Sequence, residues 1–146
     1  MRAKFLNTGM AGVALAALAL AGSPALAENV SFKATLSASR EVPPNSSKGT
    51  GSADATYDTV SKKLTWTVTF SGLTGNATMA HFHGPAEAGK NAGVAVPIPG
   101  TASPLAGSAT LTDAQAADLM AGKWYVNVHT ADNKGGEIRG QVGKAK

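Results

Sequence analysis

Apolar side chains recur at every second position along most of the chain, and this alternation restricts the fold more than any other feature. The clearest run is 64–70, where Leu64, Trp66 and Val68 alternate with threonines. A period of two places one set of side chains on a single face of a β-strand. Seven more segments fit short strands: 30–38, 53–57, 78–83, 94–98, 106–111, 124–129 and 137–142. Turn-forming residues separate these runs, so the pattern predicts an all-β fold, either an antiparallel sandwich or a Greek-key barrel.

One short helix is expected within this β pattern. Thr112 and Gln115 have the spacing of a capping box, and Gly122 can end a helix in the left-handed conformation. The apolar residues of 116–120 would then lie on one face and cover the sheet. The segment 84–93 is rich in glycine, alanine and charge, and we expect it to be a long loop beside the strand that precedes it.

The first 27 residues have the pattern of a secretory signal peptide. Arg2 and Lys4 precede an apolar run over 9–22, and Ala25-Leu26-Ala27 fits a small-residue cleavage site. The run is shorter than the about 20 apolar residues that a membrane span needs. We therefore expect one exported domain, residues 28–146, periplasmic or secreted, with no membrane span after cleavage. A retained anchor or an ordinary helix is the alternative interpretation.

Composition narrows the classes of function. The chain of 146 residues has no cysteine, which rules out disulfides and thiolate metal sites. Its formal net charge of +4 includes two positive charges of the expected leader, so the remaining domain is nearly neutral and nucleic-acid binding is not expected. The sequence shows no Gly-x-Ser-x-Gly turn and no carboxylates spaced for acid/base work. A non-enzymatic binding module is the expected class.

All three histidines lie in two strand-like segments, and this clustering is the main functional signal. His81 and His83 are two residues apart, so on a strand they share a face and can bind one metal ion. His129 can be the third ligand if its strand lies near theirs. The pattern predicts a copper or zinc site at these residues. A hydrogen-bonded structural cluster and unrelated surface positions are the alternatives.

Met79 is a possible fourth ligand, because it falls on the same strand face as His81 and His83. A thioether beside imidazoles favours copper, whereas magnesium and calcium sites are built from oxygen. A core position is the other interpretation of Met79, since methionine fills irregular gaps in protein interiors.

Three polar residues are expected to surround the ligands. If the segments 124–129 and 137–142 form a hairpin, Glu137 and Arg139 share the face of Asn127 and His129. Glu137 could then hydrogen-bond and orient the His129 ring, as carboxylates often do for ligating histidines. The alternative is a Glu137–Arg139 ion pair on a solvated face, worth at most about 1 kcal/mol.

Four motifs occur in the order expected for a known family. They are LSASREVPP at 36–44, HFHGPA at 81–86, WYVNVHT at 124–130 and GEIRGQ at 136–141. Over residues 32–142 the chain resembles the CHRD domain, named for chordin and also found in many exported bacterial proteins. The resemblance implies an immunoglobulin-like β-sandwich or barrel, with protein interaction the role usually suggested. A cell-envelope or extracellular interaction or adhesion domain, with structural histidines and contacts made by edge strands or the 84–93 loop, is therefore the alternative function.

The His-x-His pattern also resembles the copper-ligand strand of Cu/Zn superoxide dismutases. Those enzymes use more histidines than this chain contains and usually carry a disulfide, so dismutase activity is not expected. Metal binding is what this resemblance implies, and weak copper-dependent redox activity stays a third hypothesis.

Overall fold

A computed structural model describes Ser23 and residues 26–146. The predicted signal peptide therefore lies almost entirely outside the described residues. Within the described part, no helix is both long enough and apolar enough to cross a bilayer.

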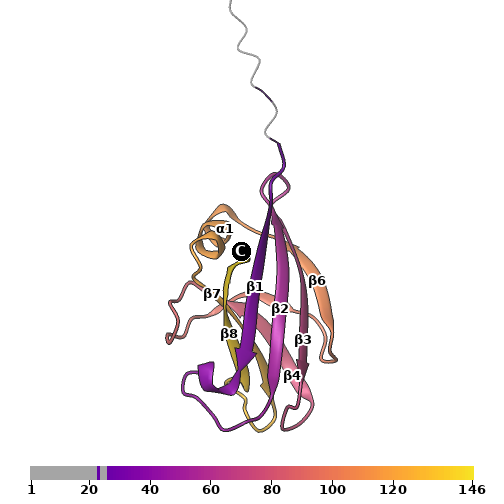
Figure 1. Ribbon diagram of the computed structural model, residues 1–146, viewed down its shortest axis with the longest axis vertical. Coiled ribbons are helices and arrows are strands. Elements are labelled where there is room, and N and C mark those ends of the chain that lie inside the picture. Colours follow the sequence, from indigo (N-terminus) through magenta and orange to yellow (C-terminus); the bar gives the residue numbers. More distant parts are fainter. Residues whose placement is uncertain (1–22, 24–25) are drawn as a thin grey trace, which may run out of the picture.

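Eight antiparallel strands form a single sheet that curls on itself (Figure 1). The elements are β1 (Asn29–Ser37), η1 (Ala38–Arg40), β2 (Thr50–Asp58), β3 (Lys63–Ser71), β4 (Ala77–His83), β5 (Val94–Ile98), β6 (Leu105–Thr110), α1 (Asp113–Met120), β7 (Trp124–Thr130) and β8 (Ile138–Lys144). The strand order is β5-β4-β7-β8-β1-β2-β3-β6. The edge strands β5 and β6 contact each other, so the sheet is a nearly closed barrel. The all-β prediction is confirmed, in its barrel form.

The inner faces of the strands supply the core. In β3, Leu64, Trp66 and Val68 are at most 3% exposed, while the threonines between them face solvent, as the alternation predicts. The ring of Phe82 in β4 packs against Trp66 at 5.3 Å and against Trp124 at 5.8 Å between centroids. The contact with Trp66 joins strands that are distant in the sheet order, whereas the contact with Trp124 joins neighbouring strands. Together the three rings fill part of the barrel interior.

The helix α1 forms where the capping residues predict it. Thr112 Oγ1 accepts a hydrogen bond from the Gln115 backbone N–H, and the Gln115 side chain accepts one from the Thr112 backbone N–H. Gly122 follows the helix at a φ of 73°, the left-handed conformation that glycine adopts without strain. Leu119 is fully buried, so α1 is held at one end of the barrel by its apolar face (Figure 1).

Strand β7 differs from its neighbours because all seven of its residues are buried. Its inner face lies in the core, whereas Tyr125, Asn127 and His129 belong to the outer face and are still at most 6% exposed. The loop 84–93, predicted from composition, covers this outer face: the Tyr125 hydroxyl donates to the Ala92 carbonyl and accepts from the Ala92 N–H. The barrel therefore carries a buried polar layer outside its sheet.

Candidate metal centre

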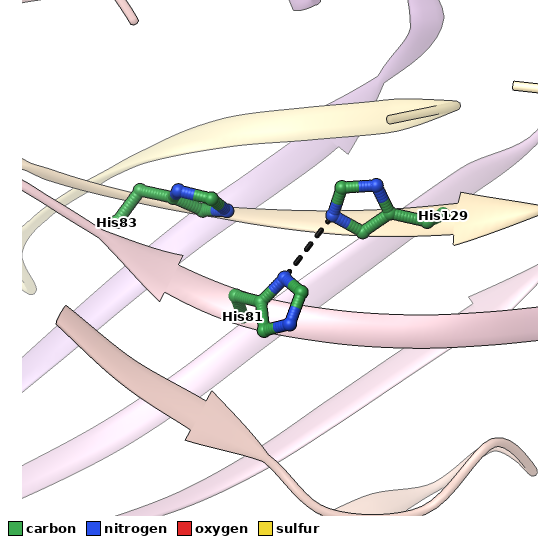
Figure 2. A group of neighbouring side chains, drawn as sticks. All are labelled: His81, His83 and His129. Carbon is green, nitrogen blue, oxygen red and sulfur yellow. Dashed lines mark hydrogen bonds between the residues drawn. The ribbon is translucent and has the colours of Figure 1, made fainter. Parts of the chain in front are cut away.

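The pairing of β4 with β7 brings the three histidines together. In this register Met79 lies opposite His129, His81 opposite Asn127 and His83 opposite Tyr125. Figure 2 shows the three rings turned toward one another from the two strands. One ring nitrogen of each residue lies within 4.8 Å of the other two. The strand of His129 therefore lies directly beside the strand of His81, as a shared metal site requires.

The ring of His129 is fixed by the backbone. Its Nδ1 lies 2.8 Å from the Lys134 carbonyl oxygen, which can only accept, so Nδ1 carries a hydrogen and Nε2 is the nitrogen left to bind a metal ion. That Nε2 lies 3.2 Å from Nδ1 of His81 (Figure 2). Two nitrogens that bind one tetrahedral ion at about 2.0–2.1 Å are about 3.3 Å apart. The observed spacing fits a pair of ligands as well as a hydrogen bond.

The ring of His83 is held between two oxygen atoms. Its Nδ1 lies 3.0 Å from the Ala92 carbonyl, and its Nε2 lies 2.9 Å from Oδ1 of Asn127. Burial lowers the pKa of His83, so the ring is neutral at neutral pH and has one N–H to donate. If that hydrogen is donated to Ala92, Nε2 presents a lone pair toward Asn127. A cation near Nε2 would stabilise this arrangement of lone pairs.

His81 completes the cluster at its more exposed side. Burial lowers the pKa of His81, and the neighbouring His129 and His83 lower it further. Neutral imidazole is the form that binds a metal ion. Because His81 is only partly buried, an ion from solvent has a route to the cluster.

Met79 lies beside this cluster and outside the core. Its side chain is 49% exposed, and its position opposite His129 places it on the outer face of β4. The interpretation of Met79 as a core residue is wrong, because Ala80 and Phe82 take the inner face of the strand.

Glu137 does not orient His129, and that hypothesis is wrong. Its carboxylate accepts hydrogen bonds from Ser47, Thr74 and Thr130, at 2.5–2.8 Å. Burial alone raises the pKa of Glu137, but these donors outweigh it and lower the pKa to about 2. Both carboxylate oxygens are occupied by these donors, and Nδ1 of His129 is bound by the Lys134 backbone carbonyl instead.

Arg139 on β8 lies opposite Asn127 on β7, as the hairpin register predicts. Both residues are buried. The solvated ion pair of Glu137 with Arg139 is wrong, because both residues are at most 2% exposed and no salt bridge joins them. The Arg139 guanidinium lies 3.4 Å from the Tyr125 ring centroid. The Tyr125 ring also stacks on the ring of His83, which is parallel to it within 4°. Tyr125 therefore contacts both the Arg139 guanidinium and a candidate metal ligand.

Sequence reasoning missed three groups of this layer. Two of them are the backbone carbonyls of Ala92 and Lys134, which contact His83 and His129. Any residue has such a carbonyl, so these contacts cannot be predicted from the pattern of side chains. Glu41 is 5% exposed, and burial raises its pKa to about 7 although Arg139 acts in the opposite direction. Glu41 lies in the motif at 36–44, directly after Arg40, and nothing in that local pattern distinguishes a buried carboxylate from an exposed one.

Comparison with known proteins identifies the family of this chain. The model of the CHRD domain family matches residues 32–142, from β1 to β8. No curated protein and no solved structure matches the chain. The match covers most of the chain and includes the histidine-bearing strands β4 and β7. The chain belongs to the CHRD domain family.

Proposed function

We propose that this chain is an exported, non-enzymatic binding module that holds a copper or zinc ion through His81, His83 and His129. One observation carries the proposal: one nitrogen of each ring converges within 4.8 Å of the others. Membership in the CHRD family supports a binding module, and the leader-like sequence at 1–27 supports export.

The hydrogen bonds around the cluster support a metal rather than a purely structural role. His83 and His129 each have Nδ1 against a backbone carbonyl, of Ala92 and Lys134. Ligating histidines commonly donate their second N–H in this way, which fixes the tautomer and the ring orientation. Of the nitrogens that remain, Nε2 of His129 lies beside the His81 ring, whereas Nε2 of His83 contacts Asn127. Metal binding would need His83 Nε2 to exchange its contact with Asn127 for the ion.

The donor set favours copper or zinc over harder ions. Three neutral imidazoles suit both metals, whereas magnesium and calcium require oxygen ligands. Three protein ligands leave a fourth position for water or for another group. Met79, exposed and opposite His129, is the candidate for that position, and a thioether there would favour copper.

Calorimetric titration of the purified protein with Zn(II), Cu(II) and Cu(I) tests the proposal. We expect one ion per chain with a dissociation constant tighter than about 1 μM. The double variant His81→Ala, His83→Ala should lose this binding, while the matched control Thr65→Ala and Thr67→Ala, on the outer face of β3, should retain it. Absence of submicromolar binding, or equal binding by the histidine variant, would reject the metal site.

The second candidate is an envelope or extracellular protein-interaction module whose histidines are structural. Family membership and the tight packing of the outer layer favour it. It predicts that the double histidine variant melts at a lower temperature while any weak metal affinity stays unchanged. Proteins that co-purify with the chain would then identify the partner.

Weak copper-dependent redox activity is the third hypothesis. It predicts that the copper-loaded protein consumes superoxide faster than the same concentration of free copper. A rate equal to or below that of free copper leaves the non-enzymatic proposal in place.

A further inference from the structure

A pocket that no histidine lines lies on the outer face of the barrel. Its volume is about 390 Å³, and its walls come from η1, the loop 84–93 and β8. The lining residues are Arg40, Ala88, Gly89, Arg139 and Gln141. Small-molecule sites commonly occupy about 300–1,000 Å³, so the pocket has room for a compact ligand.

Two arginines line this pocket, and no carboxylate lines it. Among the described residues, no salt bridge involves Arg40 or Arg139. Arg40 is exposed, whereas Arg139 is 2% exposed and is held by neutral groups, the Asn91 side chain at 2.8 Å and the Lys90 carbonyl. A buried charge without a counterion is costly. An anion in the pocket would compensate it.

The nearest acid to Arg139 compensates this charge only in part. Glu41 follows Arg40 in the chain, and Arg139 acts on its carboxyl through their charges. Burial nevertheless raises the pKa of Glu41 to about 7, so near neutral pH it carries only a fraction of a negative charge. The Asn91 and Lys90 contacts bring no charge. The pocket therefore keeps a net positive character.

The remaining walls are mostly apolar, and one of them is held by side-chain hydrogen bonds. Most of the accessible lining is apolar, and Ala88 and Gly89 come from the covering loop. The Gln141 side chain is fixed because its Nε2 donates to the carbonyls of Ala86 and Gly122, each at 2.9 Å. A preformed pocket loses little conformational entropy when a ligand binds.

We infer that the pocket between Arg40 and Arg139 binds a small organic carboxylate with an apolar body. A guanidinium binds a carboxylate through two parallel hydrogen bonds, and two such groups favour an anion over a neutral molecule. The apolar walls would cover the rest of the ligand. Inorganic anions lack a body that can use these walls, so they should bind more weakly.

Titration with benzoate, followed by two-dimensional amide NMR of the purified protein, tests this inference. The protein is first freed of metal on a chelating resin, which separates the result from the histidine cluster. We expect saturable shifts centred on Ala88 and Gly89, with a dissociation constant of about 1 mM or tighter. Benzyl alcohol and inorganic phosphate should each bind at least about tenfold more weakly.

Charge variants decide which groups recognise the ligand. Arg40→Gln removes an exposed charge at the pocket and should weaken benzoate binding at least about tenfold. Lys63→Gln removes the same charge from the exposed face of β3 and should leave benzoate binding unchanged. Arg139→Lys keeps the charge but loses the planar fork and should also weaken binding. If that variant does not fold, benzoate binding by Arg40→Gln is the deciding measurement.

The inference is overturned by the absence of saturable shifts, by equal binding of benzoate and benzyl alcohol, or by unchanged benzoate binding in Arg40→Gln. Phosphate bound as tightly as benzoate would reject the organic carboxylate as the ligand class.

Discussion

Glu137 is a buried carboxylate that joins distant segments at one end of the barrel. It is 0% exposed and accepts hydrogen bonds from Ser47, Thr74, Thr130 and Asn133. These donors come from the segment before β2, the β3–β4 connection, the end of β7 and the β7–β8 turn. One acidic side chain therefore fixes the relative positions of four chain segments.

We expect Glu137→Gln to lower the free energy of unfolding by about 2–3 kcal/mol. The amide replaces one acceptor oxygen with a donor that faces other donors, and hydrogen bonds to a charged group are lost. Urea unfolding at pH 7 measures the change. The control Glu87→Gln alters an exposed carboxylate and should change the free energy by no more than about 0.5 kcal/mol. An equal effect of the two substitutions would contradict the role of Glu137.

Acid should remove the contribution of Glu137 over a defined range of pH. Its pKa is 4.5 in the unfolded reference and about 2 in the folded protein, so the folded state favours the ionised form. The stabilisation is complete above the unfolded pKa and is lost as the pH falls from about 4.5 toward 2. Urea unfolding of wild type and Glu137→Gln at several pH values should show their difference shrinking across this range. A constant difference would contradict it.

At the residue scale, the sequence predicts the histidines better than their surroundings. His81 and His83 share a face because they are two apart in one strand, which is a local property. The partners of the rings, the Lys134 and Ala92 carbonyls, depend on where two loops fold, and a backbone atom carries no residue signature. Glu137 shows the same error, because its position was predicted while its hydrogen-bond partners come from distant segments.

At the scale of elements, the contact of β7 with the loop 84–93 determines how firmly the candidate metal site is held. The Tyr125 hydroxyl makes two hydrogen bonds to Ala92, whose carbonyl also receives the His83 ring. The loop is therefore tied to the strand through the same residue that orients a candidate ligand.

Tyr125→Phe should loosen the loop without unfolding the barrel. Loss of these hydrogen bonds should cost about 1 kcal/mol and speed amide hydrogen exchange across 84–93. Tyr57→Phe, in the core-facing side of β2, is the control and should leave the exchange of this loop unchanged. Unchanged loop exchange in Tyr125→Phe would show that the loop is held by other contacts.

The existence of the elements follows from the sequence, but their order in the sheet does not. All eight predicted strands and the helix form, since alternation and capping residues act over a few positions. The pairing of β4 with β7 joins segments more than forty residues apart, and nothing local selects it. The burial of both faces of β7 was also missed, because alternation of Val126 and Val128 with polar residues is typical of a strand with one solvated face.

At the scale of the whole molecule, metal binding should stabilise the barrel. The ligands come from β4 and β7, and the geometry that brings them together exists only in the folded state. An ion at 100 times its dissociation constant contributes about 2.7 kcal/mol, which corresponds to about 5–10 °C in the melting temperature of a domain of this size.

Differential scanning calorimetry with and without zinc measures this shift. The variant His81→Ala, His83→Ala should show no metal-dependent shift, whatever its own melting temperature. A similar shift in the variant would mean that the ion acts elsewhere on the protein.

The near closure of the barrel also limits how this protein can interact with other proteins. The edge strands β5 and β6 contact each other, and β5 contains Pro97, which has no backbone N–H to offer. A chain with free edges could add strands from a neighbour and polymerise. Here we expect the contact between the two edges, together with Pro97, to disfavour such growth. We therefore expect a partner to be recognised mainly through side chains and loops.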